Sequence, residues 1–256
     1  MLLRKRERFE RTDVPSYGPH SNAIAVGVLL AIAIFLVVLV GSLWKKANDA
    51  ATLNDKRLTA SLGSQADVRD PEEGYRVSDD RFMNLLVLTV DNASATSPTL
   101  HAAQLLSLNV TAGTGSLVSL PLNTKLAGDA GDTTLEALFA QAGPSALPAP
   151  LSAATNVSLG HVLVAPDGTA ERLEGMKGRG VSAILGSAPS VLTTINTDMG
   201  TGQLLDLAEL IQSIGVDNIS RADAVASQEE DGSGGVRSVL DQTQLGVALG
   251  ILVPAE

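Results

Sequence analysis

The chain has 256 residues and a formal net charge of −10, from 18 Lys and Arg against 28 Asp and Glu. It has no cysteine, which excludes disulfides, thiolate metal sites and a cysteine nucleophile. Its three histidines, His20, His101 and His161, have no carboxylate three or four residues further on, so a zinc or iron site is not expected. The acidic balance also argues against a nucleic-acid partner, because binding to phosphate backbones needs clustered Lys and Arg.

A continuous apolar stretch over residues 23–43 is the first strong feature of the chain. It has no charged residue, and as a helix it would be about 31 Å long, which matches the hydrocarbon core of a bilayer. Trp44, Lys45 and Lys46 follow it, as is typical of a membrane interface. A buried core helix and a signal peptide fit less well, since the stretch is apolar on every face and no Ala-x-Ala-like cleavage site follows it. We therefore expect a single transmembrane helix over residues 22–44, with the lipid bilayer as its partner.

The distribution of charge predicts the orientation of this helix. Residues 1–46 carry 7 basic and 3 acidic residues, a net charge of +4, whereas residues 47–256 carry 11 and 25, a net charge of −14. Five basic residues precede the span and four follow it closely, so the positive-inside rule favours a cytoplasmic N-terminus by a narrow margin. We expect a single-pass protein of the cell membrane, with residues 1–21 as a disordered basic tail in the cytoplasm and an extracytoplasmic domain after the span.

Residues 45–80 are expected to link the span to this domain. Good helix formers, with Leu53, Leu58 and Leu62 roughly on one side, indicate that the anchor helix continues as a short stalk. Pro71 and Gly74 then break the helix. The remaining residues, 81–256, are sufficient for one domain with a hydrophobic core.

Strand and helix patterns follow one another through the domain. Residues 82–90 (FMNLLVLTV), 103–110 and 116–120 have the composition of β-strands, and the last two are close enough to pair as a hairpin. Continuous apolar runs indicate burial on both faces of a sheet that helices cover. Further on, we expect helices over residues 133–143 (capped by Asp132 or Thr133), 150–154, 169–176, 181–195, 201–214 and 242–251, strands over 161–165 and 236–240, and a polar loop over 227–235. This order predicts an α/β domain, with α+β as the alternative, in which helices flank a central sheet in three layers.

Residues 84–91 read NLLVLTVD, residues 117–124 read LVSLPLNT, and residues 156–167 read NVSLGHVLVAPD. These segments resemble three strands of LytR-CpsA-Psr domains. The first of those is typically Asn-Ile-Leu-Leu-Leu-Gly-x-Asp, another ends in Ser-Ile-Pro-Arg-Asp-Thr, and the last is of the type Ile-Asp-His-Tyr-Val-x-Val-Asp. The likeness extends to the expected helix at 133–143 and to the segment 197–214.

This resemblance implies both a fold and an activity. The fold is a mixed sheet between helix layers, held outside the bacterial membrane by one N-terminal span. The implied activity is the transfer of a glycopolymer from a polyprenyl-pyrophosphate carrier to peptidoglycan, with arginines holding the pyrophosphate and an Asp-bound divalent cation such as Mg²⁺. These charges are needed because pyrophosphate leaves readily only when guanidinium groups and a metal ion neutralise it.

The charged motifs of the family are missing from this chain. Residues 99–102 read Thr-Leu-His-Ala where the family has Arg-x-Asp-Thr, and residues 121–124 read Pro-Leu-Asn-Thr where it has Pro-Arg-Asp-Thr. Asp91 remains from the acidic set, and Lys177 and Arg179 are the basic candidates in the later region. Loss of two arginines and two carboxylates removes many kcal/mol of transition-state stabilisation, so we expect a degenerate, inactive member.

The candidate ligand-binding residues lie at the mouth of the expected sheet and in the later basic segment. They are Asp91, His101, Asn123, Lys125, Lys177 and Arg179. No catalytic residue and no metal ligand is assigned. Structural alternatives stay open, because an Asp after a strand often forms a turn and a surface lysine is often only solvated. An apolar cavity at this mouth, long enough for a prenyl chain, would support a lipid-linked ligand.

Three functions remain open at this point. The leading one is a membrane-anchored envelope protein that binds a lipid-linked carrier, a wall polymer such as peptidoglycan, or an active paralogue, without catalysis. The second is an active glycopolymer phosphotransferase that uses Asp91, Lys125, Lys177 and Arg179, with Mg²⁺ as its cofactor. The third is a structural protein whose domain serves only as a docking surface for the envelope machinery.

Overall fold

The computed structural model describes residues 53–255, apart from 94, 96, 129–130, 168–194 and 232–233. The predicted tail and membrane span lie outside the described residues. So do the predicted helix 169–176, all but the last residue of the predicted helix 181–195, and the candidates Lys177 and Arg179. No helix within the described part of the chain is long and apolar enough to cross a membrane.

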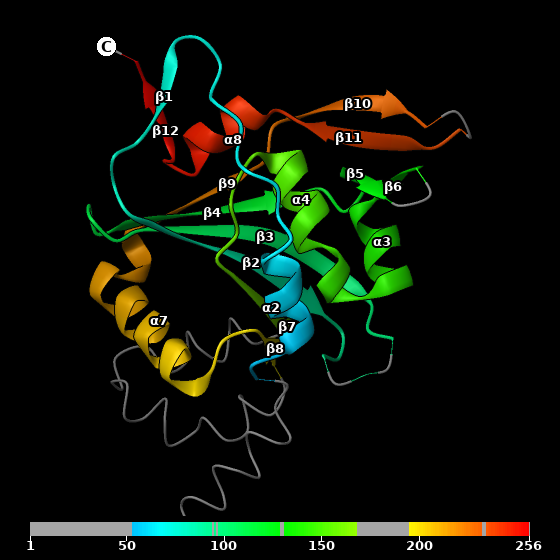
Figure 1. Ribbon diagram of the computed structural model, residues 1–256, viewed down its shortest axis with the longest axis horizontal. Coiled ribbons are helices and arrows are strands. Elements are labelled where there is room, and N and C mark those ends of the chain that lie inside the picture. Colours follow the sequence, from blue (N-terminus) through cyan, green and yellow to red (C-terminus); the bar gives the residue numbers. More distant parts are fainter. Residues whose placement is uncertain are drawn as a thin grey trace, which may run out of the picture. The chain divides into compact units, whose positions relative to one another are not determined.

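The centre of the domain is a mixed sheet of six strands in the order β8-β7-β2-β3-β4-β9 (Figure 1). Strand β3 is antiparallel to β2 and to β4, and β8 is antiparallel to β7. The pairs β2·β7 and β4·β9 are parallel. The mixed α/β domain is therefore confirmed. The strands are β2 (Phe82–Val90), β3 (Leu100–Asn109), β4 (Thr114–Leu120), β7 (His161–Pro166), β8 (Asn196–Thr197) and β9 (Ile219–Asp223).

Strand β2 is an interior strand with apolar residues on both faces, as its sequence predicts. Successive side chains of a strand point to opposite faces, so an apolar run such as NLLVLTV fills two layers at once. Leu86 belongs to the core on one face, and the neighbouring Leu85 belongs to the core on the other. Their partners in the register with β3 are Leu105 and Leu106.

Helices cover both faces of the sheet. On one face, the larger core includes Leu58, Leu86, Leu105, Phe139 and Leu151. Four helices contribute to it: α2 (Lys56–Leu62), α3 (Leu135–Ala142), α4 (Pro148–Thr155) and α8 (Gln242–Ala248). On the other face, α7 (Thr201–Ile214) packs Leu207 and Ile214 against Leu85 and Leu108 (Figure 1). The layers are thus helix, sheet and helix, and the predicted bounds of α7 are confirmed.

The segment expected to form a stalk and linker, residues 45–80, is part of the folded domain over its described portion. Leu58 is 0% exposed and lies in the larger core. The backbone N–H of Asp55 donates to the carbonyl of Thr197 at 3.0 Å. Further along, β1 (Tyr75–Val77) pairs with β12 (Leu252–Pro254). The prediction was wrong because a leucine stripe on a short helix fits a core contact as well as it fits a free stalk.

The polar segment 227–235 and the end of the closing helix also differ from the predictions. The polar segment 227–235 was expected as a loop, but β10 (Ala226–Glu230) pairs there with β11 (Val236–Leu240), because backbone pairing needs no apolar side chains. The closing helix ends at Ala248, since Gly250 takes a positive φ of 76° that few other residues adopt.

The hairpin of β5 and β6 determines where helix α3 begins. Strand β5 (Lys125–Gly128) pairs with β6 (Gly131–Thr134), and Thr133 lies in that ladder opposite Leu126. Neither Asp132 nor Thr133 is therefore the N-cap. Thr134 takes that role, and its hydroxyl accepts a hydrogen bond from the backbone N–H of Ala137 at 3.2 Å.

Candidate functional site

One edge of the sheet gathers several of the predicted site residues. Strands β2, β4, β7 and β9 run in the same direction, so their carboxyl ends share this edge, and β3 begins there. In open α/β sheets, ligands bind outside the carboxyl ends of the strands. Asp91 follows β2, Asp167 follows β7, and His101 is the second residue of β3. We call these three residues the acidic edge.

Asp91 closes the connection between β2 and β3. Its Oδ1 accepts hydrogen bonds from the backbone N–H of Asn92 at 2.7 Å and of Thr99 at 2.8 Å. The bonds from Thr99 and Asn92, together with the nearby charge of His101, hold the pKa of Asp91 below its ordinary value of 3.8. Asp91 therefore stabilises the turn after β2, which was the structural alternative in the sequence analysis. It carries a negative charge at neutral pH.

His101 pairs with Asp167, which joins the start of β3 to the end of β7. The distance from His101 Nδ1 to Asp167 Oδ2 is 2.5 Å, and the two side chains are 44% and 54% exposed. A carboxylate on one ring nitrogen fixes the orientation of the imidazole and leaves the other nitrogen for a ligand. Asp167 was not singled out from the sequence, although it follows an apolar strand just as Asp91 does.

Lys125 and Asn123 belong to a different group. Lys125 Nζ lies 2.9 Å from Glu229 Oε1 and 3.0 Å from Asp132 Oδ2, and the hydrogen bonds that Lys125 donates to Glu229 and then to Asp132 raise its pKa above the ordinary value of 10.5. Asn123 donates from Nδ2 to the carbonyl of Val236 at 3.0 Å. Both side chains hold the β10–β11 hairpin against the domain.

The structure therefore brings together Asp91 and His101 but not the other described candidates. Within the residues that the structure describes, neither Lys125 nor Asn123 makes a hydrogen bond or ion pair with the acidic edge. No lysine or arginine of that part of the chain bonds to Asp91, His101 or Asp167 either. The acidic edge thus combines two carboxylates and one imidazole.

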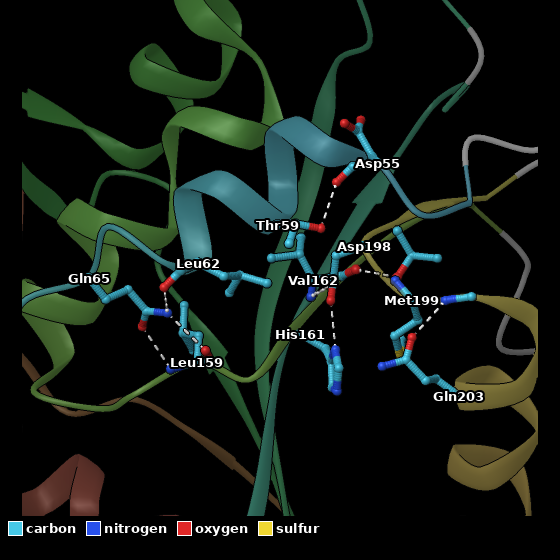
Figure 2. Close-up of polar contacts among 12 residues, drawn as sticks. Asp55, Thr59, Leu62, Gln65, Leu159, His161, Val162, Asp198, Met199 and Gln203 are labelled. Atoms are coloured by element: carbon cyan, nitrogen blue, oxygen red, sulfur yellow. Dashed lines mark hydrogen bonds and ion pairs between the residues drawn. The ribbon is translucent and has the colours of Figure 1, made fainter.

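A second histidine and carboxylate pair, His161 and Asp198, lies at the start of β7 (Figure 2). The acidic edge lies at the other end of this strand. His161 Nδ1 is 2.7 Å from Asp198 Oδ2, and Asp198 Oδ1 accepts from the backbone N–H of Val162 at 2.7 Å. The side chains are 21% and 7% exposed. Because Asp198 is buried with both oxygens bonded, this pair fixes the turn between β8 and α7 and has a structural role.

Two cavities lie beside the helices. One, of about 480 Å³, is lined by small residues of α2, β5, α3 and α4, among them Ala60, Ala127 and Ala149. The other, of about 390 Å³, is lined by residues that include Arg57 and Asn196. Neither is lined by Asp91, His101 or Asn123, so these two cavities do not open at the predicted mouth.

The acidic edge does not fit the divalent cation that the resemblance implies. A Mg²⁺ site needs several oxygen ligands free to take octahedral positions. Here Asp91 Oδ1 already accepts two backbone N–H groups, and Asp167 is bonded to His101. Across the described residues, no three His, Asp or Glu side chains are grouped so that they could hold a metal ion.

Comparison with solved structures identifies the type of fold. No family model matches the chain. No curated protein matches it either. Among solved structures, it is similar to protein gbs0355 from Streptococcus agalactiae, with 9% identity, a TM-score of 0.53, and coverage of 69% of this chain and 90% of that one. It is also similar to TagV from B. subtilis, with 11% identity, a TM-score of 0.51, and coverage of 68% and 96%.

TagV is a LytR-CpsA-Psr protein, so the domain has a fold of the LytR-CpsA-Psr type. A third structure, the transcriptional regulator yvhJ from Bacillus subtilis, shares 10% identity over 68% of this chain and 96% of that one, with a TM-score of 0.51. At such low identities the likeness concerns the fold.

Proposed function

We propose that this protein is a membrane-anchored cell-envelope protein whose domain binds a glycopolymer, either on its lipid carrier or in the wall, without transferring it. The LytR-CpsA-Psr type of fold and the apolar stretch over residues 23–43 support the envelope setting. The acidic edge, where the carboxyl ends of four strands meet, supports the position of the ligand.

The observation that carries this proposal is the charge of the acidic edge. Phosphoryl transfer depends on cations that neutralise the charge developing in the transition state. Asp91 and Asp167 instead place two carboxylates beside His101, and none of the three is bonded to a lysine or arginine of the described chain. A pyrophosphate group at this edge would meet like charge, which disfavours its binding and does not stabilise the polyprenyl phosphate that would leave.

The ion pairs of Lys125 also argue against the alternative of an active transferase. Its ammonium group is held between Glu229 and Asp132. A cation that two carboxylates neutralise contributes little attraction to a distant phosphate. The alternative then depends on Lys177 and Arg179, which charge-removing substitutions would test directly.

The acidic edge is better suited to hydroxyl groups. Ionised carboxylates accept hydrogen bonds, and an imidazole can accept or donate one. Sugar hydroxyls are donors that such groups bind without any opposite charge. The glycan part of a polymer is therefore the part that we expect Asp91, His101 and Asp167 to contact.

A binding experiment with the full chain in lipid nanodiscs tests this proposal. The probe is a polyprenyl-pyrophosphate-linked glycan, and Asp91→Ala and Asp167→Ala should each weaken its binding severalfold. Asp79→Ala is the matched control, because the side chain of Asp79 is 95% exposed and pairs with Arg76. Equal binding by all three variants would contradict the proposed site and favour a docking protein.

A further inference from the structure

The hairpin of β10 and β11 has one strand on the body of the domain and one on the outside. The two strands form a sheet of their own. The inner strand is β11, because Ser238 forms a bridge with Thr124 and its backbone N–H donates to the carbonyl of Asn123 at 3.0 Å. Strand β10 lies on the other side of β11 (Figure 1), and among the described residues it pairs only with that strand. β10 is therefore an edge strand.

The register of the hairpin shows which backbone groups of β10 point away from β11. In an antiparallel pair, residues that exchange hydrogen bonds alternate with residues whose N–H and C=O groups point outward. The backbone N–H of Asp231 donates to the carbonyl of Gly235 at 2.9 Å, so this pair at the end of the ladder is of the bonded kind. Every second residue back along β10 then bonds to β11. The residues between them, with outward backbone groups, are Ala226, Gln228 and Glu230.

We call the outward N–H and C=O groups of these three residues the β10 edge. Within the part of the chain that the structure describes, they make no hydrogen bond. Residues 227–230 are all exposed, so the groups are also accessible. An edge of this kind is a template on which an extended segment adds as a further strand. Proline or lysine often blocks such an edge, and β10 has neither.

The charge of β10 indicates which kind of strand fits. The strand has two acidic residues and no basic one. Glu229 is paired with Lys125 at 2.9 Å, whereas Glu230 makes no ion pair with any residue that the structure describes. Across neighbouring strands, opposite charges stabilise the pairing and like charges destabilise it. The acidic side chains therefore disfavour a second copy of β10 and favour a basic strand.

We propose that the β10 edge binds an extended segment of another protein that has lysine or arginine at alternate positions. The backbone of this segment pairs with the outward groups, and one of its cationic side chains pairs with Glu230. Lys125 and Asn123 hold the hairpin in place, so the edge needs little ordering when the segment binds. This docking site is separate from the acidic edge and does not depend on a glycopolymer ligand.

Fluorescence anisotropy with the full chain in phosphatidylcholine nanodiscs tests the site. The probes are three labelled peptides: one that alternates lysine and threonine, one with glutamate in place of lysine, and the lysine peptide with methylated backbone nitrogens. We expect the lysine peptide to bind about tenfold more tightly than the other two, because one meets like charge and the other lacks backbone donors. No binding of the lysine peptide, or equal binding of its methylated form, would overturn the proposal.

Two variants of Gln228 test strand addition from the side of the protein. Gln228→Pro removes an outward N–H that the ladder with β11 does not use, and edge strands tolerate proline at such positions. Gln228→Ala is the matched control, since both variants lose the bond from Gln228 Nε2 to Ser238 Oγ at 3.3 Å but only proline loses the N–H. Gln228→Pro should weaken binding of the lysine peptide about tenfold relative to Gln228→Ala. Equal binding by the two variants would refute strand addition.

Two further variants separate the contact with Glu230 from general charge attraction. Glu230→Gln should weaken binding of the lysine peptide severalfold. Glu209→Gln removes the same charge from an exposed position on α7, outside the hairpin, and should leave binding unchanged. Equal effects of these two substitutions would mean that only the overall charge of the protein attracts the peptide, and would refute the site.

Light scattering of nanodiscs that each hold one chain tests the remaining occupant, a second copy. We expect single discs in the absence of peptide, because the acidic edges of two copies repel each other. Pairs of discs that form with Gln228→Ala but not with Gln228→Pro would show that a second copy occupies the β10 edge, and would refute the basic partner.

Discussion

Leu58→Ala is the substitution that best tests whether residues 53–80 belong to the folded domain. Leu58 is 0% exposed and packs in the core that the sheet shares with α2, α3, α4 and α8. The substitution removes three buried carbon groups at about 0.8 kcal/mol each and leaves a cavity. Together these effects should lower the free energy of unfolding by about 3–4 kcal/mol.

Hydrogen exchange of the full chain measures this effect. The amides of β2 and β3 exchange through global unfolding, so their protection should fall roughly 100-fold or more in Leu58→Ala. Thr59→Ala is the matched control, because Thr59 is exposed and its hydroxyl donates only to the carbonyl of Asp55 on the surface. Equal and small losses of protection in both variants would mean that α2 is a separate stalk, and would refute the reasoning.

Four further substitutions test local features. Ser107→Ala should leave the melting temperature unchanged or raise it, because the buried Ser107 Oγ has no hydrogen-bond partner among the described residues. Ser152→Ala should lower the free energy of unfolding by about 1–2 kcal/mol, because the Ser152 hydroxyl donates to the carbonyl of Val157 at 2.7 Å. A lower melting temperature for Ser107→Ala than for Ser152→Ala would contradict this reasoning. Above the unfolded pKa of 3.8, Asp91→Asn should have a lower free energy of unfolding than the unchanged chain. This difference in stability should disappear as the pH falls through the lower pKa of Asp91 in the folded state. A difference that grows in acid would mean that folding raises the pKa of Asp91. Gly143→Ala should cost about 1 kcal/mol in urea unfolding, since Gly143 caps α3 at a φ of 76°, and an unchanged midpoint would count against that cap.

The elements that hydrophobic patterning dominates could be predicted from the sequence. Strand β2 and helix α7 were placed with their observed bounds. The strand is a continuous apolar run that ends at Asp91, and the helix has a clear helical period that ends at Gly215. The order of apolar strands and helices was likewise enough to predict helices around a central sheet.

The elements that depend on distant partners could not be predicted in this way. Strand β10 is almost wholly exposed, so its sequence has no alternation, and it forms because β11 supplies the backbone partners. Helix α2 has a leucine stripe that gives no sign of what covers it. The sequences of β10 and α2 alone do not determine these structures, because both depend on tertiary contacts.

The same limit applies to the candidate site. Asp91 and His101 could be placed together from the resemblance, but the Asp167 that fixes His101 is 66 residues further on. Lys125 was a reasonable candidate to bind phosphate. Its sequence context does not show that it pairs with Glu229, 104 residues further on. Residue type and spacing indicate which side chains can do chemistry, whereas long-range pairing decides which of them are free to do it.

The most direct test of the account is a turnover measurement on the full chain in nanodiscs. A polyprenyl-pyrophosphate-linked glycan, peptidoglycan as acceptor and Mg²⁺ are supplied together, and the released polyprenyl phosphate is measured. Because no lysine or arginine of the described residues bonds to the acidic edge, and phosphoryl transfer needs such cations, we predict that the glycan binds and that release stays at the level of empty nanodiscs. Release above that level that Asp91→Asn abolishes would contradict the account.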